Sequence, residues 1–208
     1  MTKRPLRRLL ARVFLGLTGW KVEGVRPDAK QYVLIAAPHT SNWDFPYFLA
    51  FAAYFEIEAA WMGKHTIFRW PFGRIMRALG GIPVQRHKRE DLVSAMARTF
   101  DDREELALTV PAEGTRSLVE YWKSGFYHIA TTANVPIVMS YLDYTKKIGG
   151  FGPAFFPSGD LAKDMDTIRA FYQGRQGKHP ELSGPIRLRE EAEAKAGNLS
   201  EAEPPSPR

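Results

Sequence analysis

Short apolar runs alternate with stretches of helical periodicity through most of the sequence, and this alternation restricts the possible folds more than any other feature. Predicted strands cover residues 32–37, 57–62, 82–85, 106–110 and 137–142, and predicted helices cover 43–55, 74–79, 90–103 and 126–132. Continuous apolar runs of this length are typical of strands that are buried on both faces. The order of the elements therefore predicts an α/β fold with a mostly parallel central sheet flanked by helices.

The composition indicates a single folded domain. The 208 residues are 44% hydrophobic, which supplies one full core. Cysteine is absent, so disulfide bonds, thiolate metal sites and a cysteine nucleophile are excluded. We expect an amphipathic helix in residues 1–20, the main domain in 21–175, and a polar, partly disordered tail in 176–208.

The net charge of +6 is concentrated at the N-terminus. Residues 1–30 contain eight Lys and Arg against two acidic residues, which leaves 21 of each sign in the remainder. The same segment is amphipathic, because apolar side chains recur at helical spacing opposite several arginines: Leu6, Leu9, Leu10, Val13, Phe14 and Leu17. Such a helix either packs on the protein's own core or lies in the headgroup layer of an anionic membrane, and it is too short to span one.

His39 and Asp44 form the first candidate for chemistry. His39 follows a predicted strand and Asp44 falls in the first turn of the next helix, so the turn between them allows the two side chains to converge. A carboxylate that orients a histidine makes a general base. The sequence contains no Gly-x-Ser-x-Gly motif, so the hydroxyl to be activated would belong to a substrate. On these two residues alone, a local hydrogen bond and a helix N-terminal acid are the simpler interpretation.

A second group of polar residues follows two other predicted strands. Glu113, Gly114, Thr115 and Arg116 form a loop in which glycine permits close approach and the last two residues offer ligands for a phosphate. Arg86 follows the strand at 82–85 and can supply a second cationic contact. A charged glycine turn and a solvated arginine are the structural alternatives. Because ligands of open α/β sheets gather beyond the carboxyl ends of strands, we expect these residues to share one crevice with His39.

The order of these motifs resembles that of the glycerolipid acyltransferases, the superfamily that contains the lysophosphatidic acid acyltransferases. Four blocks match in order over roughly residues 30 to 145: His39-x4-Asp44, Gly81 to Arg86, Glu113-Gly114-Thr115-Arg116-Ser117, and Val135-Pro136-Ile137-Val138. The third block departs from the family pattern, because Ala112 replaces the usual proline and Pro111 precedes it. In the second block, Pro83 and Gln85 replace the usual apolar and acidic residues.

The resemblance implies acyl transfer from acyl-CoA or acyl-carrier protein to the hydroxyl of a lysophospholipid, with lysophosphatidic acid as the simplest acceptor. In the family pattern His39 is the base and Asp44 its partner, and Arg86, Glu113, Gly114, Thr115 and Arg116 bind the acceptor. Neither a metal nor a cofactor is implied, and nucleic acid is not expected as a partner. Another lysophospholipid, a lyso-aminolipid, simple thioester hydrolysis and a non-catalytic lipid-binding role remain alternatives.

Two further expectations concern the membrane and the aromatic residues. The basic amphipathic helix predicts peripheral attachment to the cytoplasmic face of an anionic membrane. The aromatic-rich stretch at 61–72 can line an acyl channel, dip into lipid or pack in the core. The remaining histidines lack the spacing of metal ligands.

Overall fold

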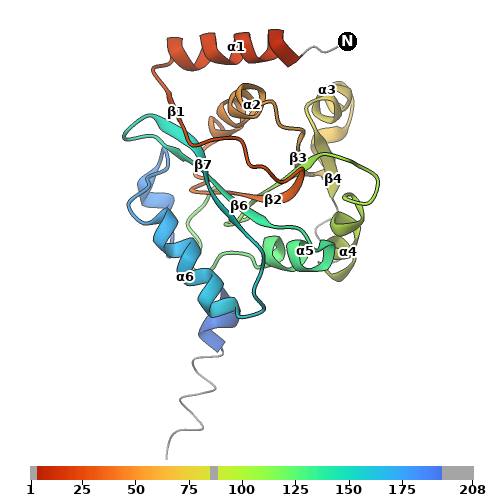
Figure 1. Cartoon of the computed structure of the whole chain (residues 1–208), viewed down its shortest axis with the longest axis vertical. Helices are drawn as coiled ribbons and strands as arrows, with labels where there is room; N and C mark the ends of the chain where they lie inside the picture. Colours follow the sequence, from red (N-terminus) through yellow and green to blue (C-terminus); the bar gives the residue numbers. More distant parts are fainter. Residues whose placement is uncertain (1–3, 85–88, 194–208) are drawn as a thin grey trace, which may run out of the picture.

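A seven-stranded sheet forms the centre of the protein, with the strand order β1-β7-β6-β2-β5-β3-β4 (Figure 1). The structure is a computed structural model and describes residues 4–84 and 89–193. The strands are β1 (Lys21–Glu23), β2 (Gln31–Ala36), β3 (Ala59–Lys64), β4 (Gly81–Val84), β5 (Leu106–Pro111), β6 (Ile137–Asp143) and β7 (Ile148–Phe155). Five neighbouring strands are parallel, whereas β7 runs antiparallel to β6. The predicted α/β fold with a mostly parallel sheet is confirmed.

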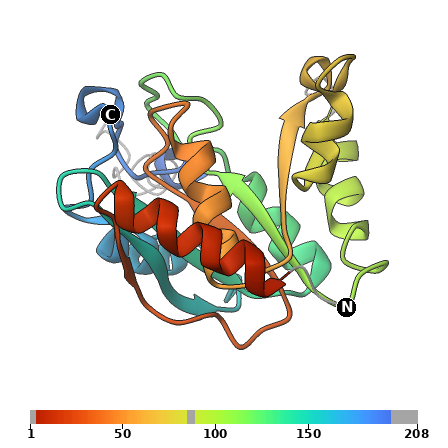
Figure 2. The ribbon, with the colours of Figure 1, turned by 90° about the horizontal axis from the view of Figure 1, so that it is seen from above.

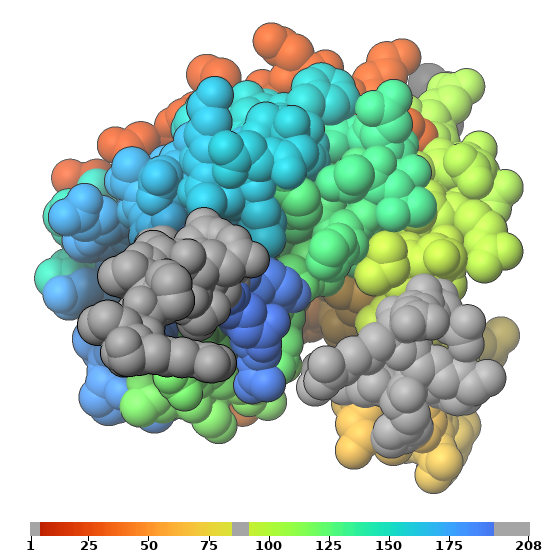
Figure 3. All heavy atoms as spheres, turned by 90° about the horizontal axis from the view of Figure 1, so that it is seen from below, coloured from red at the N-terminus to blue at the C-terminus, as the bar shows by residue number. Residues whose placement is uncertain are grey.

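Helices cover both faces of this sheet. They are α1 (Arg4–Leu17), α2 (Asp44–Tyr54), α3 (Gly73–Ala78), α4 (Arg89–Arg98), α5 (Gly125–Ala133) and α6 (Leu161–Tyr172), with short 3-10 turns η1 (His65–Phe68) and η2 (Pro180–Leu182). In Figure 1, α1, α2 and α3 lie above the sheet and α4, α5 and α6 lie below it. Figure 3 looks at the lower face, where these last three helices form a continuous cover. No helix in the described part of the chain has the length and apolar character needed to cross a bilayer.

The middle strands of the sheet explain the main core and the position of the loops. Val33, Ile35 and Leu108 are fully buried against the helices below, while other side chains of the same strands face α2. Burial on both faces fits the apolar runs of β2 and β5. These strands are in parallel register from Gln31 to Ala36, so the loops that leave their carboxyl ends lie next to each other. The predicted crevice beyond the strands is therefore built around these two loops.

The N-terminal helix α1 packs on α2 with a narrow face and turns its broad apolar face outward. Ala11 and Leu15 are buried, and Arg8 lies 3.8 Å from Glu56 on the same inner side. The outward side chains are exposed, with Leu17 at 84%. They are Leu6, Leu9, Leu10, Val13 and Leu17. Packing on the protein's own core, the first alternative raised by the sequence, therefore accounts for only a small part of the amphipathic pattern.

The chain beyond residue 175 is more ordered than its composition predicts. Leu188 is fully buried and pairs with Trp122 in an isolated parallel bridge. Arg169 of α6 donates to buried Glu191 at 2.8 Å. Residues 176–193 therefore belong to the domain rather than to a tail, because a few apolar and ionic anchors hold a segment that is otherwise polar. Residues 194–208 lie outside the described part.

Candidate active site

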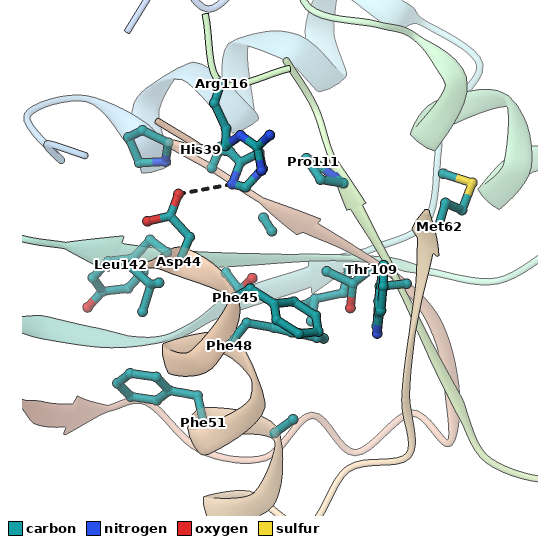
Figure 4. Close-up of a pocket in the computed structure, with 18 of the residues that line it drawn as sticks. His39, Asp44, Phe45, Phe48, Phe51, Met62, Thr109, Pro111, Arg116 and Leu142 are labelled. Atoms are coloured by element: carbon teal, nitrogen blue, oxygen red, sulfur yellow. Dashed lines mark hydrogen bonds and ion pairs between the residues drawn. The ribbon is translucent and has the colours of Figure 1, made fainter. Parts of the chain in front are cut away.

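The loop between β2 and α2 brings His39 and Asp44 together, as the turn in the sequence predicts. Nδ1 of His39 lies 2.9 Å from Oδ2 of Asp44, which is the first residue of α2. A dashed line marks this contact in Figure 4. The second ring nitrogen, Nε2, has no hydrogen-bond partner among the described residues, and His39 lines a cavity. An Nδ1–H that donates to the carboxylate leaves Nε2 as the proton acceptor.

Asp44 is held in place by a set of hydrogen bonds that leaves it little freedom. Its Oδ2 also accepts the backbone N–H groups of Thr40 at 3.1 Å and Ser41 at 3.0 Å. Its Oδ1 accepts the Tyr144 hydroxyl at 2.7 Å, and the residue is 6% exposed. The N-cap residue of α2, Trp43, makes no side-chain cap hydrogen bond. The carboxylate instead bonds back to the loop before the helix and fixes its path.

Glu113 supports the same loop from behind rather than lining the cavity. Its Oε1 accepts the backbone N–H of His39 at 2.9 Å. The side chain is buried, and Oε2 has no hydrogen-bond partner in the described structure. Burial raises the pKa of this carboxyl, although the N–H of His39 opposes the shift. The geometry therefore gives Glu113 a positioning role toward His39, and it does not support the predicted contact with a substrate.

A cavity of about 590 Å³ opens beside His39 and runs between α2 and the sheet. Its inner wall is apolar, with Phe45, Phe48 and Phe51 projecting from successive turns of α2 (Figure 4). Further lining residues come from β3, β5, β6, β7 and α3: Trp61, Met62, Thr109, Leu142, Phe151 and Met76. A volume in this range suits a ligand the size of a lipid chain or a drug. One end is polar and carries His39 and Asp44.

The rim of the polar end is formed by Gly114, Thr115 and Arg116, which line the cavity as the sequence predicts. Gly114 has φ +69, and a Cβ placed on it would lie 3.1 Å from the side chain of Lys123. Arg116 is exposed and donates to the Asn42 side chain, beside His39 (Figure 4). The remaining donors of a guanidinium at this place can form a bidentate contact with a phosphate. Arg86, the other predicted anion ligand, lies outside the described residues.

The turn into this rim accommodates the change in the third block. Ala112, which stands where the family has proline, is fully buried. Its carbonyl accepts the N–H of Lys123 at 2.7 Å, and the N–H of Gly114 bonds to Pro111 at 3.0 Å. The departure therefore leaves a closed turn that still delivers Arg116 to the cavity.

Two hydrogen-bonding contacts that hold the site were not predicted from the sequence. Tyr144, which bonds Asp44, is a hundred residues away from it in the chain, so no spacing could connect them. The segment 176–179 backs the loop, since the N–H of His179 bonds the Thr40 hydroxyl at 3.1 Å. A Cβ on Gly177 would lie 2.5 Å from that hydroxyl oxygen. Gly177 is the only signal in the sequence for this close approach. The polar composition of the segment instead predicted a tail.

The arrangement can remove a proton from a hydroxyl brought to Nε2 of His39. Within the described residues no serine or threonine hydroxyl bonds to the His39 ring, so the structure offers it no protein nucleophile. In the same part of the chain no group of three histidines and carboxylates is arranged to hold a metal ion. The geometry is suited to base catalysis on a hydroxyl brought beside the apolar cavity and the exposed arginine.

Comparison with known proteins identifies the family of this chain. The chain belongs to the acyltransferase family, because the sequence model of that family matches residues 20–142. No curated protein matches the sequence significantly. Among solved structures, the fold is similar to that of the 1-acyl-sn-glycerophosphate (LPA) acyltransferase PlsC from Thermotoga maritima, with a TM-score of 0.57 and 16% sequence identity over 96% of this chain and 80% of that chain. The predicted resemblance to the glycerolipid acyltransferases is confirmed.

Proposed function

We propose that this acyltransferase moves a fatty acyl group from an acyl thioester, acyl-CoA or acyl-carrier protein, to the free hydroxyl of lysophosphatidic acid and so forms phosphatidic acid. The observation that carries the proposal is the His39–Asp44 pair at the polar mouth of an apolar cavity. The reaction needs a base, a place for an acyl chain and a site for a charged headgroup at one point. These three requirements meet where β2 and β5 end.

In the proposed reaction, Nε2 of His39 takes the proton of the acceptor hydroxyl as its oxygen attacks the thioester carbonyl. Asp44 stabilises the resulting imidazolium through Nδ1–H. The tetrahedral intermediate then collapses, the carbon–sulfur bond breaks and the thiolate takes the proton back from His39. Acyl transfer is thus direct, with no bond between the acyl group and the protein.

The rim supports a phosphate on the acceptor. Arg116 is exposed at the mouth, and its described polar partner is a neutral amide rather than a carboxylate. Its charge is therefore available to an anion, and a planar guanidinium suits phosphate oxygens. Thr115 on the same loop adds a hydroxyl to the lining.

The outward face of α1 supports attachment to the cytoplasmic face of an anionic membrane. Leucines at Leu10 and Leu17 are exposed on a helix whose Arg7 and Arg12 are exposed as well. An apolar stripe beside cations is stabilised in the headgroup layer rather than in water. Peripheral attachment would place the cavity near its lipid substrate.

The substrate assignment is tested by incubating the protein with a panel of lysolipids and with both donor types, and by identifying the products with mass spectrometry. We expect phosphatidic acid when lysophosphatidic acid is the acceptor. Acylation only of another lysophospholipid or of a lyso-aminolipid would change the acceptor and keep the chemistry. Release of free fatty acid at the same rate with and without acceptor would instead indicate thioester hydrolysis.

The membrane assignment is tested separately by co-sedimentation with phosphatidylcholine vesicles that contain phosphatidylglycerol. Replacing Leu10 and Leu17 together by serine should weaken binding, because both side chains are exposed and neither supports the core. Equal binding of this variant and the unaltered protein would contradict attachment through α1.

A further inference from the structure

The segment η1–α3 exposes aromatic and aliphatic side chains far beyond what its packing requires. Trp70 is 92% exposed and Phe72 is 63% exposed, and Ile67 and Ile75 also face solvent. Buried Phe68 anchors the segment, with its ring 5.8 Å from that of Trp61. The exposed side chains therefore form a surface on a well-anchored element rather than a loosened part of the core. We refer to Ile67, Trp70, Phe72 and Ile75 as the η1–α3 patch.

Positive charge surrounds the η1–α3 patch. No acidic residue occurs between Glu58 and Glu90 in the sequence. Lys64, Arg69 and Arg74 are exposed around the patch, and none of them has an acidic partner within the described residues. Apolar rings bordered by unpaired cations are the combination that favours the interface of an anionic bilayer.

The patch borders the cavity. Ile67 lines the cavity and belongs to the patch, and Met76 of α3 lines it from the same side. Figure 1 places α1, α2 and α3 on the same side of the sheet, with α1 above α2 and α3 beside it, and Figure 2 shows them from above. A planar surface that meets α1 and α3 would thus lie across the α2 side of the molecule, where the cavity runs.

We propose that the η1–α3 patch is a second membrane-contact site, which binds anionic lipid and brings the cavity mouth to the bilayer surface. The inference extends the membrane attachment proposed above and assigns it a contact that α1 does not provide. A second copy of this chain fits less well, because two such patches in a symmetric dimer would face each other with like charges. A lipid surface satisfies both the rings and the cations.

The test compares vesicle binding of the full chain with that of Trp70→Ser/Phe72→Ser. Neither side chain lines the cavity or supports the core, so circular dichroism and the melting temperature should stay unchanged. We expect affinity for vesicles of phosphatidylcholine and phosphatidylglycerol to fall about tenfold, because two aromatic side chains no longer leave water. Removing phosphatidylglycerol or raising the salt concentration should also weaken vesicle binding by the unaltered protein.

Phe156→Ser is the matched control. Phe156 is 60% exposed, close to the value for Phe72, but it follows β7, which lies next to the edge strand β1 and is separated from β3 by three strands. Phe155 pairs with Ile137, the first residue of β6, whereas η1 follows the carboxyl end of β3. Phe156 and the η1–α3 patch therefore lie at opposite ends of the strands. The control should bind vesicles like the unaltered protein. Equal binding of the double variant, or an equal loss in the control, would overturn the inference.

Two further outcomes are distinguishable. Sedimentation velocity without lipid would overturn the inference if the unaltered protein were a dimer and the double variant a monomer. Because vesicle binding is measured without substrates, it stands apart from the proposed reaction. If the protein binds vesicles through the patch but acylates no lysolipid, only the proposed function is contradicted. If the protein transfers acyl groups in detergent micelles and the double variant binds vesicles normally, only the role of the patch is contradicted.

Discussion

The loop that carries His39 and Asp44 and the loop that forms the rim lie side by side, yet their hydrogen bonding differs greatly. Asp44 is buried and receives hydrogen bonds from the backbone, from a tyrosine and from His39. Arg116 is exposed and has a single described partner, the Asn42 side chain. The loop before Asp44 is therefore fixed before any substrate binds. The guanidinium of Arg116 in the other loop still has hydrogen-bond donors without a described partner. The comparison suggests that the chemistry is built into the fold and that headgroup recognition is completed by the ligand.

Removal of either His39 or Asp44 should have the largest effect on activity. His39→Ala should lower kcat by about 10²- to 10⁴-fold, which is the usual contribution of general base catalysis. Asp44→Asn should give a comparable loss, because the amide no longer selects the tautomer that leaves Nε2 free. Both are measured as steady-state rates with saturating acceptor, and a double variant should lose little more than either single one. Additive losses would show that the residues do not act as a unit.

The rim should respond in KM rather than in kcat. Arg116→Ala removes the exposed guanidinium, so KM for lysophosphatidic acid should rise about tenfold or more while kcat stays nearly constant. Arg116→Lys keeps the charge but not the planar guanidinium. Its KM for lysophosphatidic acid should lie between those of the unaltered protein and Arg116→Ala. A neutral acceptor such as monoacylglycerol serves as the control, since its KM should not change. An equal rise in KM for both acceptors would mean that Arg116 does not read the phosphate.

Tyr144 tests whether the supports of Asp44 matter for catalysis. Tyr144→Phe removes one hydrogen bond to a carboxylate and should reduce kcat by up to about tenfold, with KM nearly unchanged. Tyr47→Phe is the matched control, because its ring lies 6.0 Å from that of Tyr144 but its hydroxyl makes no described hydrogen bond. If both variants lost the same activity, the effect would come from packing of the aromatic cluster.

Glu113 should have the smallest effect on rate and a visible one on stability. Its pKa is raised by burial above the ordinary 4.5, so the folded state holds the proton more tightly than the unfolded chain. Its contribution to stability is therefore complete below pH 4.5 and is lost as pH rises through the raised pKa. Glu113→Gln keeps an acceptor for the His39 N–H and removes the charge.

Urea unfolding at several pH values measures this difference. Above the raised pKa we expect the glutamine variant to be more stable than the unaltered protein, and the gap should close toward pH 4.5. Glu113→Ala, which removes the acceptor as well, should be destabilised at every pH by about 1 kcal/mol or more. Parallel pH profiles for all three proteins would contradict a buried charge at this position.

Local sequence pattern was sufficient to predict the central strands and the contact between His39 and Asp44. The apolar runs that form β2 and β5 are buried on both faces, as their composition predicts. The turn between His39 and Asp44 is short enough for the two side chains to meet. The shared edge of parallel strands then placed Arg116 beside them. These predictions succeeded because each depends on neighbours in the chain or on a general property of parallel sheets.

The misses depend on contacts between distant segments. β7 contains several glycines and a proline, so its sequence shows little preference for a strand, and pairing with β6 decides its conformation. The bond from Tyr144 to Asp44, and that from His179 to Thr40, join segments about a hundred residues or more apart. Which face of α1 would turn outward was equally open, since amphipathicity does not state what covers the apolar side.

In the proposed reaction, His39 and Asp44 activate a substrate hydroxyl and the acyl group never resides on the protein. A rapid-quench reaction with acyl-CoA and lysophosphatidic acid, followed by mass spectrometry of both lipid and intact protein, tests it most directly. We predict acylated lipid within one turnover, an unchanged protein mass, and no product with His39→Ala. A protein heavier by one acyl group that disappears when acceptor is added, or product formation by His39→Ala at the unaltered rate, would contradict the account.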